Sequence, residues 1–424
     1  MDAGVVRKAL AGACAVREAG DADAVGGVVP SFVASPGSTS ETSAVLRAAA
    51  EHELAVVARG SGGRLGWGTP PARCDLVVDM LRMDQVTEHA AGDLVAKVQA
   101  GTSMGRLAEV LATAGQQVAL DAPAGATVGG VIATGLAGPR RLRYGTPRDL
   151  LIGITVVRAD GTVAHSGGKV VKNVAGYDLG KLFAGSFGTL GLVTEATFRL
   201  HPLPPARAFV TAEFGPAATT EAMASAVASA AGSPLVPSAV EVSLGRTPQA
   251  GVLLEGSADG VAERAGLMAE LLGSAGAAGT TVSDAEPEWW GAPLAGAGGG
   301  TLVRIAFWVA ALDRVLGAIR SAAQRAGIRP AVGGPAGAGA LYADLEPGTG
   351  PAAAAGFVAA LRETLADARG SVVVLTAPAE VRAALHGAGG MHGPVPSLNL
   401  MRAIKDQFDP GHRMAPGRFP EGVS

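Results

Sequence analysis

The sequence predicts an α+β protein with at least two domains, and two observations lead to this prediction. The chain has 424 residues, which is enough for more than one hydrophobic core. Short apolar runs that suit strands alternate with amphipathic stretches that suit helices, before residue 205 and again between residues 206 and 385. Aromatic residues make up only 4% of the chain, so we expect Ala, Val and Leu to fill the cores.

In the first half, residues 1–23 are interpreted as an amphipathic helix, because charged residues interrupt their apolar stretch. Ser38, with Glu41 three residues later, is typical of a helix N-terminus. The run Leu54–Ala58 (LAVVA) predicts a buried strand. Asp160-Gly161 between two apolar runs predicts a β-hairpin.

The second half alternates expected strands with Ala-rich helices from Arg207 to about Leu385, and we expect antiparallel strands with helices on one face. Two Gly- and Ala-rich runs, residues 292–300 and 331–340, are interpreted as solvent loops. The Trp289-Trp290 pair either packs this domain onto its neighbour or lines a substrate cleft, and packing is the favoured interpretation.

Charge and cysteine content limit the classes of function. The formal net charge is −3 without clustered Lys and Arg, so neither a nucleic-acid surface nor a basic membrane anchor is expected. The two cysteines, Cys14 and Cys74, form no disulfide framework, which favours a reducing cytoplasm. No window of about 18 residues is apolar throughout, so no integral membrane segment is expected. We predict a cytoplasmic protein, or one attached peripherally to a membrane through a complex.

The expected strand at residues 54–58 runs directly into the glycine loop, residues 59–68 (RGSGGRLGWG). Consecutive glycines leave main-chain N–H groups free to contact a diphosphate, and Arg59 and Arg64 add positive charge. The loop lacks the Gly-Lys-Ser/Thr of a Walker motif, and Pro70-Pro71 stand where a Rossmann fingerprint requires a helix. A glycine-rich surface loop is the alternative.

A second glycine-rich block runs from Pro123 to Leu203 and contains the phrases GLAGPRR and KNVAGYDL. With the glycine loop, this block resembles the FAD-binding domain of the vanillyl-alcohol oxidase, or PCMH-type, flavoprotein family. Within that family the two phrases look most like the FAD-binding subunits of glycolate oxidases. The C-terminal stretch LMRAIKDQFDPGHRMAPGRF is similar to the family's closing segment.

The resemblance implies a two-subdomain PCMH-type FAD-binding domain at residues 24–205 and an α+β cap of the FAD-linked oxidase C-terminal type at residues 206–385. Residues 386–424 would then return to the FAD domain. The implied cofactor contacts fall in four groups: Arg59, Gly60, Ser61, Gly62, Gly63 and Arg64 around the diphosphate; Pro123, Thr127, Val128, Gly129 and Gly130 along the ribityl chain and flavin; Gly138, Arg143 and Gly145 beside the isoalloxazine; Gly191, Leu192 and Val193 at the adenine end.

Two departures from the family pattern refine this expectation. Covalent members attach FAD through His or Cys, commonly in the diphosphate loop, and residues 58–70 contain neither, so noncovalent FAD is expected. Metal-bearing members carry clustered His and Glu in the cap, and the seven histidines here show no such spacing. We therefore expect no metal, with a pair formed by His386 and His392 as the alternative.

The resemblance implies an FAD-dependent oxidoreductase acting on CH–OH groups, oxidising a small 2-hydroxy acid of the glycolate type within a heteromeric complex. Arg304, alone on an apolar strand, would bind the carboxylate, with Tyr342 and Lys405 as weaker candidates. His392, Tyr177 and His412 are candidate bases without a sequence signature. Two alternatives remain: a non-catalytic FAD-binding electron-relay subunit, and a sugar or aldonolactone oxidoreductase.

Overall fold

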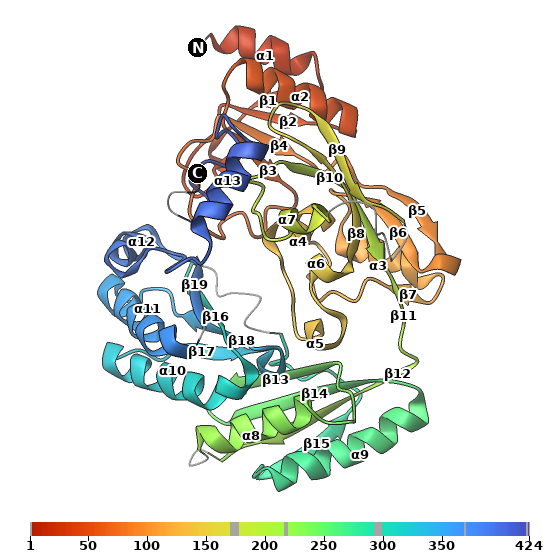
Figure 1. Cartoon of the computed structure of the whole chain (residues 1–424), viewed down its shortest axis with the longest axis vertical. Helices are drawn as coiled ribbons and strands as arrows, with labels where there is room; N and C mark the ends of the chain where they lie inside the picture. The colour runs from red at the N-terminus through yellow and green to blue at the C-terminus, as the bar shows by residue number, and fades with distance from the viewer. Residues whose placement is uncertain are drawn as a thin grey trace. The chain divides into compact units, whose positions relative to one another are not determined.

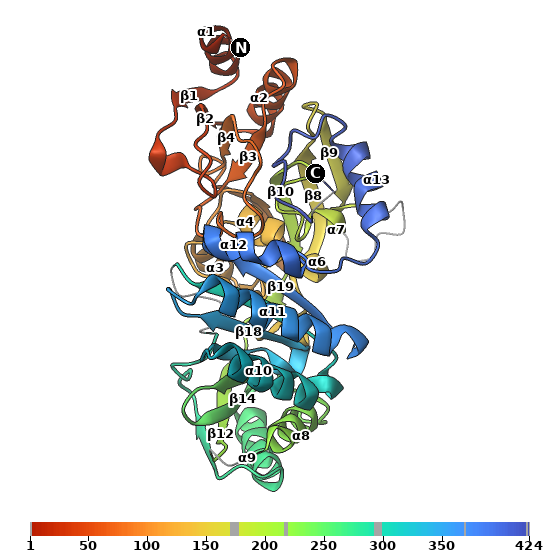
Figure 2. The ribbon, with the colours of Figure 1, turned by 90° about the vertical axis from the view of Figure 1, so that its left-hand side faces the viewer.

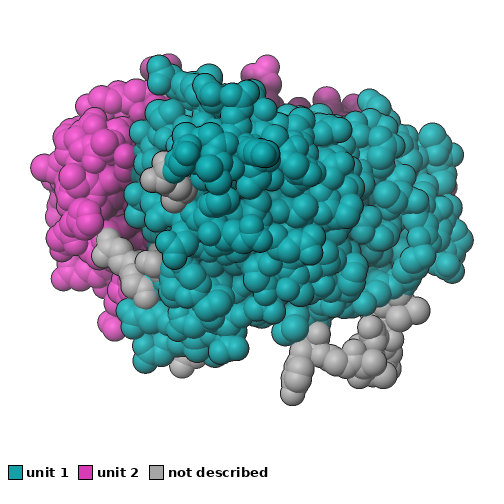
Figure 3. Space-filling model, turned by 90° about the horizontal axis from the view of Figure 1, so that it is seen from above, with its two compact units in different colours: residues 1–137, 146–203, 395–424 teal, residues 138–145, 204–394 magenta. Residues whose placement is uncertain are grey.

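The computed structural model describes residues 2–169, 178–215, 219–291, 299–368, 370–420 and 423. The chain divides into two compact units, coloured separately in Figure 3. Unit 1 comprises residues 1–137, 146–203 and 395–424, and unit 2 comprises residues 138–145 and 204–394. The main chain therefore passes between the units four times.

Unit 1 contains a four-stranded sheet in the order β1-β2-β4-β3, formed by β1 (Ala15–Glu18), β2 (Phe32–Ser35), β4 (Leu76–Asp79) and β3 (Val56–Arg59). β2, β4 and β3 are parallel, and helices α1 (Ala3–Ala11) and α2 (Thr39–Glu51) accompany them (Figure 1). The expected cap at Ser38 is confirmed, because its hydroxyl accepts from the amide of Glu41 at 3.1 Å. Buried Val45 and Leu46 of α2 join a core with the apolar strand residues.

The second sheet of unit 1 is antiparallel, in the order β5-β6-β10-β8-β9. Its strands are β5 (Val86–Ala90), β6 (Val95–Gln99), β10 (Leu192–Arg199), β8 (Leu151–Val157) and β9 (Val163–Gly167). β8 pairs with β9 around Asp160-Gly161, which confirms the predicted hairpin. The associated helices are α3 (Met104–Ala112), α4 (Val128–Thr134), α6 (Pro147–Leu150) and α7 (Gly180–Phe183), and β7 (Gln116–Gln117) pairs with β11 (His201–Pro202).

The C-terminal residues complete unit 1. Helix α13 (Leu398–Phe408) lies beside α7 and β8 (Figure 2), with the Phe408 ring 5.6 Å from that of Phe183. The following residues form a parallel bridge between Met414 and Val56 of β3, which is the edge strand of its sheet. Lys405, buried in α13, donates to the Asp409 carboxylate at 2.7 Å and to two main-chain carbonyls, so it stabilises this segment.

Unit 2 contains one eight-stranded antiparallel sheet in the order β15-β12-β14-β13-β17-β18-β16-β19. The strands are β12 (Ala206–Glu213), β13 (Ala239–Leu244), β14 (Pro248–Gly256), β15 (Gly279–Ser283), β16 (Thr301–Ala306), β17 (Ala331–Gly334), β18 (Ala340–Leu345) and β19 (Ser371–Thr376). The helices of this unit are α5 (Arg141–Tyr144), α8 (Thr220–Ala231), α9 (Ala258–Ser274), α10 (Leu312–Ala326), α11 (Pro351–Leu365) and α12 (Ala379–Leu385). Figure 1 shows α8 to α11 along one side of the sheet, as expected.

Alternation along the strands separates the two faces of this sheet. Val303 and Ile305 of β16 belong to the large core formed with the helices, so Arg304 between them belongs to the other face. Trp290 packs on that other face against Phe209 of the same unit, with ring centroids 5.1 Å apart, so the packing of the Trp pair onto the neighbouring domain stays a prediction.

Two expectations about local structure were wrong. Residues 331–340 are not a solvent loop: β17 lies between β13 and β18, and Gly337 approaches β13 so closely that a Cβ there would stand 2.6 Å from the Val240 Cβ. Small residues were mistaken for a loop because their main chain, not their side chains, makes the contacts. In residues 1–23 the helix spans only Ala3–Ala11, and strand β1 follows. Most of the run 292–300 lies outside the described residues.

Candidate cofactor and anion sites

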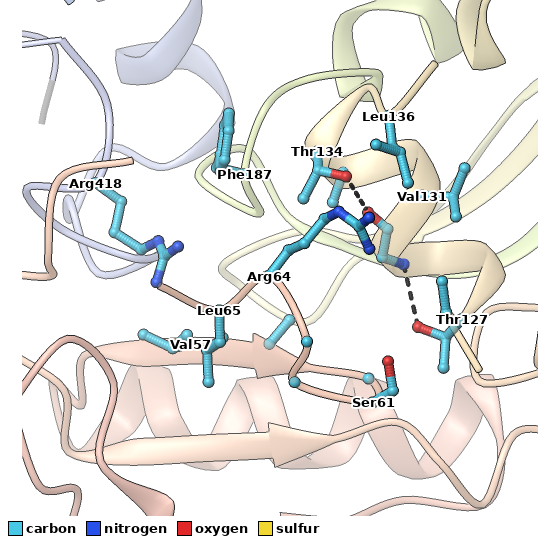
Figure 4. Close-up of a pocket in the computed structure, with 17 residues that line it drawn as sticks. Val57, Ser61, Arg64, Leu65, Thr127, Val131, Thr134, Leu136, Phe187 and Arg418 are labelled. Atoms are coloured by element: carbon cyan, nitrogen blue, oxygen red, sulfur yellow. Dashed lines mark hydrogen bonds between the residues drawn. The ribbon is translucent and has the colours of Figure 1, made fainter. Parts of the chain in front are cut away.

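An open pocket of about 610 Å³ lies where β3 runs into the glycine loop. Its walls are Val57, Ala58, Gly60–Leu65, the α4 region from Ala126 to Leu136, Phe187 and Arg418. Figure 4 shows Ser61 on the loop opposite Thr127 and Val131, with Arg64 extending across the pocket toward α4. The Arg64 guanidinium also lies 5.1 Å from the centre of the Trp67 ring.

The glycines of the loop have different physical reasons to be glycine. A Cβ on Gly60 would lie 2.0 Å from the Thr127 hydroxyl, so the loop contacts the start of α4 only because Gly60 lacks a side chain. Gly62 has a φ of +80°. A Cβ on Gly63 would meet nothing within 4 Å. No contact within the protein therefore requires a glycine at position 63, and the open space beside it leaves room for a ligand.

A second pocket of about 460 Å³ adjoins the first, since both are lined by Ala58, Gly60, Thr127, Gly130 and Ala133. Its remaining walls include Arg59, Gly129, Gly191 and Val193. Together the two pockets form an elongated space along the glycine loop and α4. An extended ligand with an anionic centre suits such a space, because several main-chain turns border it.

Arg59 contributes less charge to this space than the sequence suggested. Its guanidinium donates to Asp23 at 2.9 Å and to Asp79 at 2.8 Å. Arg17 also pairs with Asp23 at 2.6 Å, and these hydrogen bonds hold the pKa of the Asp23 carboxyl far below its usual range. Because two carboxylates already neutralise Arg59, we assign it to holding β3 and β4 in place.

In unit 2, several cationic and polar groups meet on the sheet face opposite the helices. Arg304 of β16 is the direct cross-strand partner of Tyr342 of β18, and the Arg304 side chain makes no hydrogen bond or ion pair with any described residue. Arg141 lies near enough to both that their charges act on its pKa, which burial lowers. We name Arg141, Arg304, Tyr342 and His392 the cationic cluster.

His392 follows Met391, whose carbonyl accepts from the Val374 amide of β19 at 2.8 Å. Arg362 fixes this loop by donating to the carbonyls of residues 388, 390 and 391. Burial, together with the positive charges of Arg362 and Arg304, lowers the pKa of His392 to about 4. The imidazole is therefore neutral at neutral pH and able to accept a proton.

Residues 138–145 belong to this part of the site. The Tyr144 hydroxyl donates to Glu255 at 2.9 Å, Arg143 donates to the Ser238 hydroxyl at 3.4 Å, and Arg141 donates to the Ala338 carbonyl at 3.2 Å. The segment that includes Gly138, Arg143 and Gly145 is thus part of unit 2, whereas the sequence placed it within the FAD domain.

In a comparison with protein-family models, residues 30–167 match the family described as FAD binding domain. The match contains β3, the glycine loop and α4, which are the elements that border the two pockets. Residues 30–167 are thus similar in sequence to an FAD-binding domain.

Curated relatives match less than half of the chain. The glycolate oxidase subunit GlcD of Bacillus subtilis is 40% identical over 178 residues, 42% of this chain and 38% of that protein. A D-lactate dehydrogenase of Archaeoglobus fulgidus is 38% identical over 171 residues, 40% of this chain and 38% of that protein. The matches thus span less than half the length of these relatives.

Solved structures resemble the whole chain in fold. p-Cresol methylhydroxylase with substrate bound has a TM-score of 0.76 at 16% identity, with 98% of this chain and 96% of that chain covered. Alkyldihydroxyacetonephosphate synthase has a TM-score of 0.65 at 16% identity, with 92% and 76% covered. At such identity these likenesses establish the fold alone, and they confirm the predicted PCMH-type α+β architecture.

Some residues predicted for the FAD site lie away from the two pockets. Val128 and Leu192 are buried in the interior, and Pro123 is exposed in a turn. Their part in cofactor binding remains a prediction, as main-chain contacts would not require a pocket-lining side chain. Tyr177 lies outside the described residues. His412 is exposed and contacts Asp406 at 2.9 Å.

Sequence reasoning missed Arg141 and Arg418. Arg141 stands in the phrase GLAGPRR, but its neighbours Arg304 and Tyr342 follow much later in the sequence, and no local pattern joins them. Arg418 was noted only as part of the C-terminal stretch LMRAIKDQFDPGHRMAPGRF, without a role of its own. Among the described residues, no three His, Cys, Asp or Glu gather closely enough to hold a metal ion. No described helix is both long and apolar enough to cross a membrane.

Proposed function

We propose that this chain is an FAD-dependent oxidoreductase that oxidises a small 2-hydroxy acid, of the glycolate-to-glyoxylate type. The observation that carries this proposal is Arg304, a guanidinium without a described partner, grouped with a second arginine and a neutral histidine. Such a group suits a carboxylate substrate whose hydroxyl must lose a proton. The names of the relatives, which include glycolate and D-lactate enzymes, support this substrate class.

In this proposal unit 1 holds the cofactor. The amides and small side chains of Gly60–Gly63, with Arg64, would contact the FAD diphosphate. Thr127, Gly129 and Gly130 would border the ribityl chain and flavin, and Gly191 and Val193 would border the far end of the second pocket. The fit is supported by the open space beside Gly62 and Gly63, where no protein atom lies within 4 Å of an added Cβ. No covalent attachment is included, because the loop contains neither His nor Cys.

Unit 2 would recognise the acid. Arg304 and Arg141 would donate to the carboxylate, and the His392 imidazole would accept the hydroxyl proton. When bound, FAD supplies the two-electron acceptor for the hydride that leaves the α-carbon. A carboxylate beside Arg304 would offset the positive charge that lowers the pKa of His392, so substrate binding would make His392 a stronger base.

Anaerobic mixing tests the reaction. The purified, FAD-loaded full chain would be mixed with glycolate, D- and L-lactate, or an aldonolactone, and the flavin absorbance followed. We expect a 2-hydroxy acid to bleach the flavin faster than any lactone does. If a lactone is faster, the substrate class is wrong. If no compound bleaches the flavin, the catalytic role of the isolated chain is wrong, and the electron-relay alternative replaces it.

We also propose that the chain works in a heteromeric complex, because a relative that it resembles is named a subunit. The same mixing experiment tests for a complex when it is repeated with a cell extract from the source organism. Faster turnover with a fraction that co-purifies with this chain supports a complex. Unchanged turnover and a monomeric elution volume would contradict it.

A further inference from the structure

Arg418 is a buried cation at the wall of the larger pocket. The C-terminal segment holds it there: the Val56 amide donates to the Arg413 carbonyl, the Ala415 amide to Val56, and the Ala72 amide to Pro416, each at 2.8 Å. The Arg418 side chain is consequently fixed next to the glycine loop, with only 3% of the residue exposed.

The hydrogen bonds of this guanidinium are incomplete. Nη2 donates to the Trp67 carbonyl at 2.6 Å, whereas Nε and Nη1 are buried without a hydrogen-bond partner among the described residues. No described carboxylate lies within ion-pair distance of it. Burial accordingly lowers the pKa of Arg418 to about 10.

Two other cations of unit 1, the buried Lys405 and the largely buried Arg59, have carboxylate partners. Lys405 is fully buried and has the Asp409 carboxylate at 2.7 Å, and Arg59 has two carboxylates. A buried charge without a counter-charge is costly, and N–H groups without acceptors add to that cost. Arg418 bears this cost where it borders a pocket, so a ligand anion in the pocket would supply the missing charge and acceptors.

We propose that Arg418 binds the diphosphate of the cofactor, as a ligand supplied by the C-terminal segment to the pocket of the glycine loop. This inference rests on the proposed FAD site. It assigns the charge-neutralising role to Arg418 in place of Arg59, whose charge is already balanced within the protein. The ligand class is a diphosphate ester, and a flavin without phosphate would gain nothing from Arg418.

The test compares Arg418→Met and Arg418→Lys with the wild-type full chain after flavin removal. Titration with FAD and with riboflavin, followed by flavin fluorescence, gives the two affinities. We expect Arg418→Met to weaken FAD binding about 10- to 100-fold, the loss of one or two charged hydrogen bonds, and to leave riboflavin binding unchanged. Arg418→Lys should retain part of the FAD affinity, because it keeps the charge.

The melting temperature of the flavin-free protein separates ligand binding from a structural role. Removing an uncompensated buried charge should leave the flavin-free Arg418→Met protein at least as stable as wild type. A lower melting temperature, failure to fold, or equal losses of FAD and riboflavin affinity would overturn the proposal. The proposal also fails if Arg418→Met binds FAD as tightly as wild type while Gly63→Glu loses FAD. In that case the FAD site beside the glycine loop is still supported, and only the role of Arg418 is wrong. If the wild-type chain binds no FAD, the proposed function fails first.

Discussion

The glycine loop of unit 1 offers a ligand main-chain groups from one continuous stretch, residues 59–68, whereas the cationic cluster of unit 2 consists of side chains from four separate segments. The loop requires the absence of side chains, and the cluster requires particular ones. Substitution should therefore damage the two in opposite ways: added bulk should disable the loop, and removed charge should disable the cluster. Each can be altered without touching the other.

The largest effect is expected for Gly63→Glu. The new side chain enters space that is empty in the protein, so folding should be unaffected, but it brings bulk and negative charge to the proposed diphosphate position. FAD affinity should fall about 100-fold or more, measured by fluorescence titration.

Gly92→Glu is the matched control. Gly92 is also exposed in unit 1 with nothing within 4 Å of an added Cβ, but it lines neither pocket, so FAD affinity should stay at the wild-type value. Similar flavin content in the two variants would show that the glycine loop is not part of the cofactor site.

Arg304→Met tests the other side of the comparison. Loss of a charged partner for the substrate carboxylate should lower kcat/KM for the hydroxy acid about 100-fold, with FAD affinity unchanged. The control is Arg325→Met, on the exposed side of α10 in the same unit. Steady-state kinetics give kcat/KM and flavin titration gives the FAD affinity of both variants. A parallel loss of FAD affinity in Arg304→Met would refute the division of roles between the units.

A smaller effect is expected from pH. His392 has a pKa near 4 in the folded chain and about 6.5 when unfolded, so the unfolded chain binds more protons between these values. The free energy of unfolding should therefore have its full His392 contribution above pH 6.5 and decrease toward pH 4, by at most about 3 kcal/mol. Urea unfolding at several pH values measures this, and His392→Gln should flatten the dependence.

His412→Asn is the control for that experiment. His412 is exposed in unit 1 and has a φ of +49°, which Asn tolerates. This variant measures how much of the change comes from replacing an exposed histidine. If His392→Gln behaves as His412→Asn does, His392 is not the neutral, buried group on which its proposed role depends.

No effect is expected from Cys74→Ala on cofactor retention. Cys74 is 4% exposed beside the strands, and burial raises the pKa of its thiol to about 12, so it is neither accessible nor reactive. Acid precipitation should release all yellow colour from wild type and variant alike. Flavin that stays on the wild-type pellet but not on the variant pellet would make Cys74 a covalent attachment site.

The sequence was sufficient where local signals decide structure. The hairpin at Asp160-Gly161 and the cap at Ser38 follow from turn and capping rules that involve neighbouring residues only. The glycine loop belongs to the same class, since a run of glycines after a strand is visible in a single window.

The sequence was insufficient where distant residues decide structure. The run 331–340, which contains β17, has almost no side-chain signal, and within it Gly337 must be small because it packs tightly against Val240. The pairing of Arg59 with Asp23 and Asp79 depends on three different strands or turns, so its charge appeared available when it was not. Arg141 shares unit 2 with Arg304 only because residues 138–145 leave the domain that surrounds them in sequence.

The bridge from Met414 to Val56 has a consequence for biosynthesis. β3 emerges from the ribosome early, but residues 413–415, which pair with its outer edge, follow the whole of unit 2. Until then the nascent chain exposes an open strand edge, a common starting point for pairing between chains. Unit 2, although it begins later, has all its residues available first, so we expect it to fold before unit 1 is finished.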